Sequence, residues 1–279
     1  MLLGYNSNGF AHHRLSDTVA ILYELGYRGL GLTLDVHHLN PFAAEHDAEV
    51  QTLRGQLSRC EMRSVVETGA RFLLDPRRKH QPTLLDSVAD QRTIRRRFLE
   101  NSIEIAHKLS SDCVSFWAGT PMADEPRPVL LARLVEECSR LADFAAARGV
   151  KLAFEPEPGM LIETMEQFAE LERAVNHPAF GLTLDIGHLV CLGELPVSRH
   201  MEAWQHKLWN IHIEDMKSGI HDHIAFGEGD VDFHDVFSAL SHIKYQHGIH
   251  VELSRHGHDA VRTATRSMTF LQQFVTVVP

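Results

Sequence analysis

The sequence predicts an α/β protein, a single (β/α)8 barrel over residues 1–279. Short apolar runs alternate with longer segments that repeat apolar residues every three or four positions. No linker or low-complexity stretch separates these segments, and the length suits a barrel, which typically has about 250 residues. An open doubly wound sheet is the alternative, but the first turn, residues 4–9, lacks the glycine pattern that such sheets usually carry.

The first half of the chain contains four predicted strand–helix units. Strands are expected at 2–5, 29–34, 63–66 and 113–117, and helices at 16–25, 43–59, 86–109 and 127–148. Ser16 and Asp17 are expected to cap the first helix, and Gly26 to end it. The run from Arg95 to Arg97 is expected to form a solvated face of the third helix.

The second half repeats this alternation. Strands are expected at 150–154, 180–184, 208–213 and 249–251, and helices at 164–175, 201–205, 233–243 and 260–274. Gly187 is expected to form a tight turn after the sixth strand. The sequence therefore predicts eight parallel strands whose carboxyl ends meet at one mouth, where such barrels carry their catalytic residues.

A long connection, residues 71–82, interrupts the regular spacing. It contains two prolines and a basic run from Arg77 to His80, the sharpest positive patch in the chain. A solvated loop and a lid that contacts substrate are both compatible with this pattern.

Composition narrows the classes of function. The net charge of -10 disfavours nucleic acid and anionic membrane as partners. The cysteines are far apart and predict reduced thiols; they are Cys60, Cys113, Cys138 and Cys191. The sequence shows no secretory signal and no apolar run of the roughly 18 residues that a membrane span needs, so a cytoplasmic protein is expected. The 20 histidines favour metal or proton chemistry.

Four metal-ligand residue types stand at the ends of four successive predicted strands. They are Glu155, Asp185, His212 and Glu252. Because parallel strand ends converge at the barrel mouth, this set predicts a divalent-metal site. Its oxygen-rich composition suits Mn²⁺, Mg²⁺ or Co²⁺, and Zn²⁺ is also compatible. Salt-bridged strand ends are the alternative for each residue alone.

Three further histidines lie near this set. His188 follows Asp185 by three residues, and His221 and His223 stand two apart after the seventh strand. They are candidates for a three-imidazole metal site, and a His-rich mobile loop is the alternative.

The motifs around these residues resemble the xylose isomerase-like barrel superfamily, which contains sugar isomerases and epimerases, inosose dehydratases and endonuclease IV. The motifs are residues 154–159, 183–188, 210–215 and 251–253. The resemblance implies that Glu155, Asp185, His212 and Glu252 bind the metal and that His188 reaches the substrate. It also implies that Glu155 and Glu252 form the acid/base pair.

The resemblance to endonuclease IV is partial. Residues 221–229 resemble its loop after the seventh strand, but the third strand ends at Glu67 and the fourth at Phe116 and Trp117, where that family supplies histidine ligands. Together with the acidic net charge, this argues against DNA as a substrate.

We therefore expect a metal-dependent isomerase or epimerase that acts on a sugar or sugar-like polyol through an enediolate. A lyase or dehydratase with a histidine acid is the alternative, and a non-catalytic ligand-binding barrel is a further one. The candidate substrate contacts are His188, Glu157, Trp117, Lys217 and Arg255. The ketose epimerase pattern has a glutamate where this chain has Leu161, and Glu157 or Glu163 is a candidate substitute. It has an arginine where this chain has Ser218, next to Lys217. A homo-oligomer is compatible with the sequence.

Overall fold

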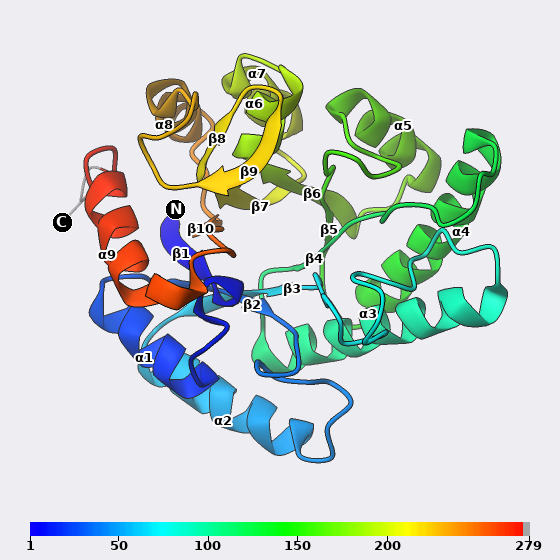
Figure 1. The fold of residues 1–279 in the computed structure, drawn as a ribbon, viewed down its shortest axis with the longest axis horizontal. Helices are drawn as coiled ribbons and strands as arrows, with labels where there is room; N and C mark the ends of the chain where they lie inside the picture. Colours follow the sequence, from blue (N-terminus) through cyan, green and yellow to red (C-terminus); the bar gives the residue numbers. More distant parts are fainter. Residues whose placement is uncertain (276–279) are drawn as a thin grey trace.

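A computed structural model describes residues 1–275 and confirms a closed barrel of parallel strands surrounded by helices (Figure 1). The order around the barrel is β1-β10-β7-β6-β5-β4-β3-β2. These strands are β1 (Leu2–Asn6), β2 (Gly29–Thr33), β3 (Arg63–Glu67), β4 (Val114–Phe116), β5 (Leu152–Phe154), β6 (Phe180–Asp185), β7 (Leu208–Ile213) and β10 (Gly248–Val251). Each predicted strand is therefore present, within two residues at either end.

The helices follow the prediction with local corrections. They are α1 (Leu15–Glu24), α2 (His46–Arg59), α3 (Ala89–Leu109), α4 (Arg127–Ala146), α5 (Met165–Val175), α6 (Ile186–Leu192), α7 (Val197–Trp204), α8 (Phe233–His242) and α9 (Ala260–Leu271), with short 3-10 turns η1 (Ser7–Phe10) and η2 (Gly257–Asp259). The expected capping of α1 by Ser16 or Asp17 is wrong, because Arg14 is its N-cap and no side chain caps it. Gly26 follows α1 with a φ of 96°, a conformation that favours glycine.

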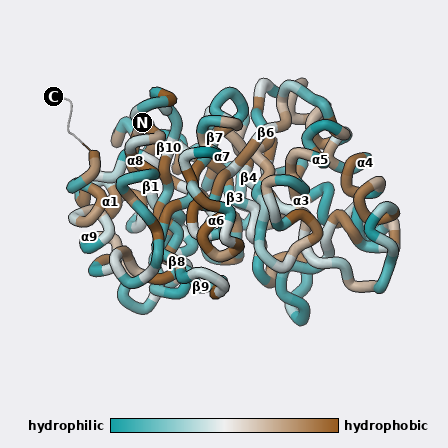
Figure 2. Tube along the Cα trace, turned by 90° about the horizontal axis from the view of Figure 1, so that it is seen from above, coloured by the Kyte–Doolittle hydropathy of each residue, from teal (hydrophilic) through white to brown (hydrophobic). Residues whose placement is uncertain are grey.

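An antiparallel hairpin that the sequence did not predict lies between β7 and α8. It consists of β8 (Asp215–Lys217) and β9 (Ile220–Ile224). Gly219, with a φ of 74°, allows the turn between its strands. Figure 2 shows the hairpin at the opposite face of the molecule from the N-terminus. His221 and His223 therefore lie on a strand and not in an irregular loop.

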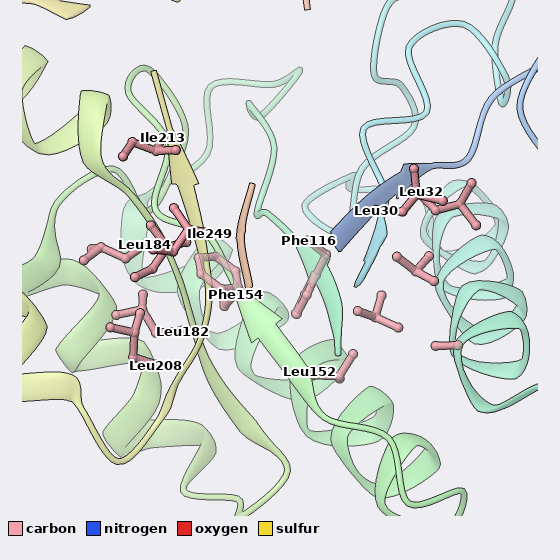
Figure 3. Packing of buried hydrophobic residues seen from close by; sticks show 14 of the residues in the cluster. Leu30, Leu32, Phe116, Leu152, Phe154, Leu182, Leu184, Leu208, Ile213 and Ile249 are labelled. Atoms are coloured by element: carbon pink, nitrogen blue, oxygen red, sulfur yellow. The ribbon is translucent and has the colours of Figure 1, made fainter. Parts of the chain in front are cut away.

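Aromatic side chains join β4, β5 and β6 to the surrounding helices. The ring of Phe154 lies 5.2 Å from that of Phe116, 5.9 Å from that of Phe180 and 6.1 Å from that of Phe168 in α5. Figure 3 shows Phe116 and Phe154 among the packed strand residues. Side chains alternate along a strand, so the outward packing of Phe154 turns the next residue, Glu155, toward the barrel interior.

A buried histidine occupies space that three glycines leave free inside the barrel. A Cβ added to Gly4, Gly29 or Gly248 would lie 2.2, 2.9 or 2.4 Å from the nearest ring atom of His250. Nδ1 of His250 lies 2.8 Å from Oδ1 of Asn210, to which it can donate a hydrogen bond. This pair lies directly beneath the candidate site.

The prediction of a solvated face for the arginine run on α3 is wrong for Arg95. Its side chain is only 1% exposed. It lies under the fourth strand's end, with its guanidinium carbon 4.3 Å from the centre of the Trp117 ring. No helix among the described residues combines the length and apolar character needed to cross a membrane.

Candidate metal centre and substrate cavity

Four side chains from four strands converge at the carboxyl ends of the barrel strands. Glu155 follows β5, Asp185 ends β6, His212 lies in β7, and Glu252 follows β10. Their donor atoms all lie within 4.8 Å of one another. Nδ1 of His212 is 2.8 Å from Oε1 of Glu155, 2.9 Å from Oε2 of Glu252 and 4.0 Å from Oδ2 of Asp185. The structure thus brings together the predicted ligand set.

The buried groups fit a divalent cation. Oδ2 of Asp185 is buried without a hydrogen-bond partner, while Oδ1 accepts a hydrogen bond from the backbone N–H of His188. Burial raises the pKa of Glu155 to about 7, and burial and Glu214 raise the pKa of Asp185 well above its usual range. Acids crowded in this way favour either protons or a metal ion, and a carboxylate-rich set with one imidazole suits Mn²⁺, Mg²⁺, Co²⁺ or Zn²⁺.

The imidazole of His212 carries the opposite shift. Burial alone would lower its pKa, but Glu67, Glu155 and Glu252 outweigh burial and hold the pKa well above its usual range. For the carboxyl group of Glu252 the directions are reversed. Burial alone would raise its pKa, but His212 and then His223 hold this pKa below the usual range. A cation at this point would take the place of the imidazolium proton between the carboxylates.

Glu67, at the end of β3, supports His212 from behind, and the sequence analysis missed this role. Its Oε1 lies 2.9 Å from Nε2 of His212 and accepts a hydrogen bond from Nδ2 of Asn210 at 3.1 Å. With the Nε2 proton directed to Glu67, Nδ1 would present its lone pair to a cation that displaces the proton between the carboxylates. The sequence does contain a signal for this role, because β3 ends in an acid as β6 does. In the sequence, Glu67 stands out only as a position where endonuclease IV has a histidine ligand.

The three additional histidines also converge. Nε2 of His188 lies 3.1 Å from Nε2 of His221, and donor atoms of both lie within 4.8 Å of one on His223. Nδ1 of His188 can donate to the backbone oxygen of Pro156 at 3.0 Å. Burial and the neighbouring His223 lower the pKa of His188 well below its usual range, and the same causes lower that of His221 to about 4. These two rings are therefore neutral at pH 7.

Glu214 adds an acid that the sequence analysis did not assign. It is fully buried, and neither carboxylate oxygen has a hydrogen-bond partner. With Asp185 and His223 it forms another group whose donor atoms lie within 4.8 Å. A Cβ on Gly187 would lie 2.1 Å from Oε1 of Glu214. Gly187, which lies in α6, has no side chain and so leaves room for the carboxylate of Glu214. The expected tight turn at Gly187 is wrong, because this residue is helical.

A cavity of about 500 Å³ opens above the candidate metal ligands. It is lined by Asn8, Thr33, Glu67, Thr68, Gly69, Arg71, Lys79, His80, Ser115, Trp117, Glu155, Glu157, His188, His212, His221, His223, Glu252, Ser254 and Arg255. Most predicted substrate contacts belong to this lining. Lys217 does not: it is exposed on β8, away from the lining, because the unpredicted hairpin carries it outward. Phe116 packs in the core, and Glu163 accepts a hydrogen bond from the backbone of Gly159.

The long connection after β3 contributes to the same cavity. Arg71, Lys79 and His80 line it, whereas Arg77 is exposed outside it. The backbone N–H of His80 donates to the oxygen of Arg71, which closes the segment between them. Two interpretations of this connection were open, a solvated loop and a lid over the substrate. Its position along the cavity wall agrees with the second.

Comparison with known proteins gives partial matches to several enzymes. An inosose isomerase of Bacillus subtilis is 29% identical over 153 residues, 51% of this chain and 55% of the relative. An inosose dehydratase of Clostridium botulinum is 24% identical over 136 residues, 43% of this chain and 45% of the relative. An L-ribulose-5-phosphate 3-epimerase of Salmonella typhi is 30% identical over 103 residues, 37% and 36% of the two chains. This chain thus matches about half the length of these relatives or less.

Solved structures match over nearly the whole chain. A D-allulose 3-epimerase from Methylomonas sp. has a TM-score of 0.78 at 18% identity, covering 99% of this chain and 98% of that one. A 3-keto-D-glucoside 4-epimerase from E. coli has a TM-score of 0.79 at 14% identity, covering 98% and 99%. The IOLI protein, described with a bound zinc atom, has a TM-score of 0.78 at 18% identity, covering 99% and 100%. At these identities the likeness concerns the fold.

The family model described as "Xylose isomerase-like TIM barrel" matches residues 19–274. This range includes all four metal-ligand candidates and the hairpin. The chain belongs to the xylose isomerase-like TIM barrel family.

Proposed function

We propose that this protein is a divalent-metal-dependent isomerase or epimerase that moves a proton next to the carbonyl of a sugar or sugar-like polyol. The observation that carries the proposal is the pair Glu155 and Glu252, which both approach Nδ1 of His212 at the floor of the cavity. Glu155, Asp185, His212 and Glu252 would hold the cation. When bound, the cation would withdraw charge from a carbonyl and its adjacent hydroxyl and so acidify the C–H bond between them.

Glu252 is the better candidate for the base. His212 and His223 favour its ionised form, and Nδ2 of Asn8 donates a hydrogen bond to its Oε1 at 2.8 Å. This contact fixes the carboxylate while its Oε2 faces the centre. Glu155, the second glutamate at the centre, would return a proton to the substrate. Return to the neighbouring carbon gives isomerisation, and return to the opposite face of the same carbon gives epimerisation.

Replacement of Glu252 by glutamine tests this assignment. Glutamine keeps the shape and one ligand oxygen but cannot accept the proton. The E252Q variant should retain substantial metal and lose at least ~100-fold in turnover, the scale of general-base removal. In D₂O the wild-type protein should place deuterium next to the carbonyl of its substrate. Turnover of E252Q at the wild-type rate would refute the proton-transfer mechanism.

A lyase or dehydratase is the second candidate, and His223 favours it. Burial would lower the pKa of His223, but Glu214 outweighs burial and holds this pKa well above its usual range, so the protonated ring at the cavity wall can give a proton to a departing hydroxyl group. The matched inosose dehydratase adds support from the same family. Mass spectrometry separates the two reactions, because an isomerase leaves the molecular formula unchanged and a dehydratase releases water. The H223Q variant should suppress water release more than deuterium exchange if the second reaction occurs.

A further inference from the structure

Two kinds of charged group meet in the cavity. The acids and the imidazole of the candidate metal centre come from the ends of β5, β6, β7 and β10 and form its acidic side. Arg71 and Lys79 come from the segment after β3 and form its basic side. The one acid of β3 itself, Glu67, is engaged with His212 and Asn210. In the strand order, β3 lies four positions from β7.

The two cations on the basic side are not neutralised by the protein. Arg71 and Lys79 form no ion pair with any residue of the described chain, and Arg71 makes one long hydrogen bond, from Nη2 to the oxygen of Ser254 at 3.5 Å. The acid of their own segment, Asp75, is occupied by Nε of Arg78 at 2.7 Å.

Arg255, another cation of the cavity lining, differs from Arg71 and Lys79 because it is paired with an acid. Arg255 also lines the cavity, but its Nη1 lies 2.6 Å from Oδ1 of Asp222. Although carboxylates are common in this chain, which has a net charge of -10, none among the described residues lies within ion-pair distance of Arg71 or Lys79.

A third positive charge lies behind the same wall. The guanidinium of Arg95 donates from Nη2 to the oxygen of Thr68 at 2.9 Å, and its buried Nη1 has no partner. Thr68 and Trp117, which Arg95 contacts, both line the cavity. A buried charge is normally paired, so this unpaired guanidinium gives the wall a positive potential. The effect is visible at His80, whose pKa is lowered to about 4 by burial and then by Lys79, Arg95 and Arg71.

We propose that the substrate carries an anionic group, a carboxylate or a phosphate, which binds between Arg71 and Lys79 on the β3 side of the cavity. This inference rests on the proposed function, since it places the reacting carbonyl at the acidic side and the anion at the other. A neutral sugar would leave both cations without a counter-charge. An anion would form charge-assisted hydrogen bonds with them and lie within the potential of Arg95.

Three ketose probes that differ at one carbon test the subsite: D-fructose, D-fructose 6-phosphate and D-fructuronate. Their affinities for the metal-loaded protein would be measured by isothermal titration calorimetry. At least one anionic probe should bind about tenfold or more tightly than D-fructose, the scale of one hydrogen bond between charged groups. The tighter of the two anions identifies phosphate or carboxylate as the group. Equal affinities for all three probes, or no binding of either anion, would overturn the proposal.

Matched variants assign the preference to the named residues. R71M and K79M keep much of the apolar stem but remove the charge, and each should reduce the preference for the anion to about threefold or less. R77M, in the same segment but outside the cavity, is the control and should keep the wild-type preference. Circular dichroism and metal content would verify that each variant is folded and loaded. A preference that survives in R71M and K79M would show that the anion binds the metal instead, and would also overturn the proposal.

Deuterium exchange in the same samples separates this inference from the proposed function. If an anionic probe binds through Arg71 and Lys79 but no probe exchanges its C–H proton, the proposed reaction is wrong and the subsite stands. If exchange occurs and all probes bind equally, the reaction stands and the subsite is wrong.

Discussion

At the scale of single residues, the position of Glu67 determines which nitrogen of His212 faces the other candidate ligands. Its carboxylate lies 2.9 Å from Nε2, so that Nδ1 is directed to the other side of the ring. Carboxylates that orient a ligating histidine typically contribute 10- to 100-fold in metal affinity, roughly. We expect E67Q to lose metal affinity by about that factor, because the amide holds the imidazole less strongly. Competition with a fluorescent chelator would measure the loss.

The control for this prediction is E136Q, on the exposed face of α4. Glu136 forms an exposed ion pair with Arg140 and lies in another part of the molecule. Its metal affinity should equal that of the wild type. Equal affinity in E67Q would show that Glu67 does not orient the ligand.

Protonation of the ligands makes metal binding depend on pH. Burial holds the pKa of metal-free Glu155 at about 7, whereas the metal-bound carboxylate is ionised. Binding therefore releases a proton below about pH 7, and lower pH must weaken binding. We expect affinity to fall by up to about tenfold per pH unit for each displaced proton between pH 8 and pH 5. A titration series with a pH-insensitive competitor would measure this, and constant affinity over the range would contradict it.

Residue types and their spacing were sufficient to predict which side chains meet at the centre. Acids at strand ends are visible in the sequence, and a parallel barrel collects them at one mouth. The roles of Glu67 and Glu214 were not predicted. That of Glu67 depends on its contact with His212, which is 145 positions away in the sequence. That of Glu214 depends on the space left by Gly187. The burial of Arg95 was missed because a charged triplet on a helix usually faces solvent.

At the scale of elements, Asp185 links the candidate metal centre to helix α6. It is the N-cap of α6, and Oδ1 accepts the N–H of His188 while Oδ2 faces the other ligands. In metal-free protein, D185N should preserve the cap, and D185A should be about 1 kcal/mol less stable than D185N. Both substitutions remove the buried charge, so their difference isolates the cap. Urea unfolding would measure it.

The metal content of the same two variants provides the second half of this test. D185A should lose the ion, and D185N should bind it more weakly because one neutral oxygen remains. Equal free energies of unfolding for both variants would show that the cap does not stabilise α6. Full metal content in D185A would remove Asp185 from the ligand set.

The hairpin β8–β9 could not be predicted from the pattern that identified the barrel strands. Its strands are short, and β9 carries Ile220, His221, Asp222, His223 and Ile224, none of which is buried. Periodicity detects an element through the face that it buries, and this hairpin buries little apolar surface. Its position over the barrel mouth explains why His221 and His223 reach His188 and why Lys217 does not reach the cavity.

At the scale of the whole molecule, the four candidate metal ligands come from strands in one half of the barrel. Glu155 and Glu252 are 97 positions apart in sequence, so the unfolded chain does not assemble the site. Binding should therefore stabilise the fold, by about 2.7 kcal/mol at a free-metal concentration of 100 Kd. Differential scanning calorimetry should show Tm rising by several degrees with metal and returning after chelation.

The H212A variant is the control for this effect, since it removes the central imidazole. Its Tm should not respond to metal or chelator. A wild-type Tm that is insensitive to both would show that the four residues do not form a metal site in the folded protein.

The buried His250 also has a consequence for the sequences of related proteins. Its ring fills space that Gly4, Gly29 and Gly248 leave open, and a methyl group at any of these positions would overlap it. The four positions, drawn from β1, β2 and β10, should therefore covary among homologues. Where one of the glycines is replaced by alanine or a larger residue, position 250 should carry a smaller side chain, and where histidine is retained, all three glycines should be retained with it.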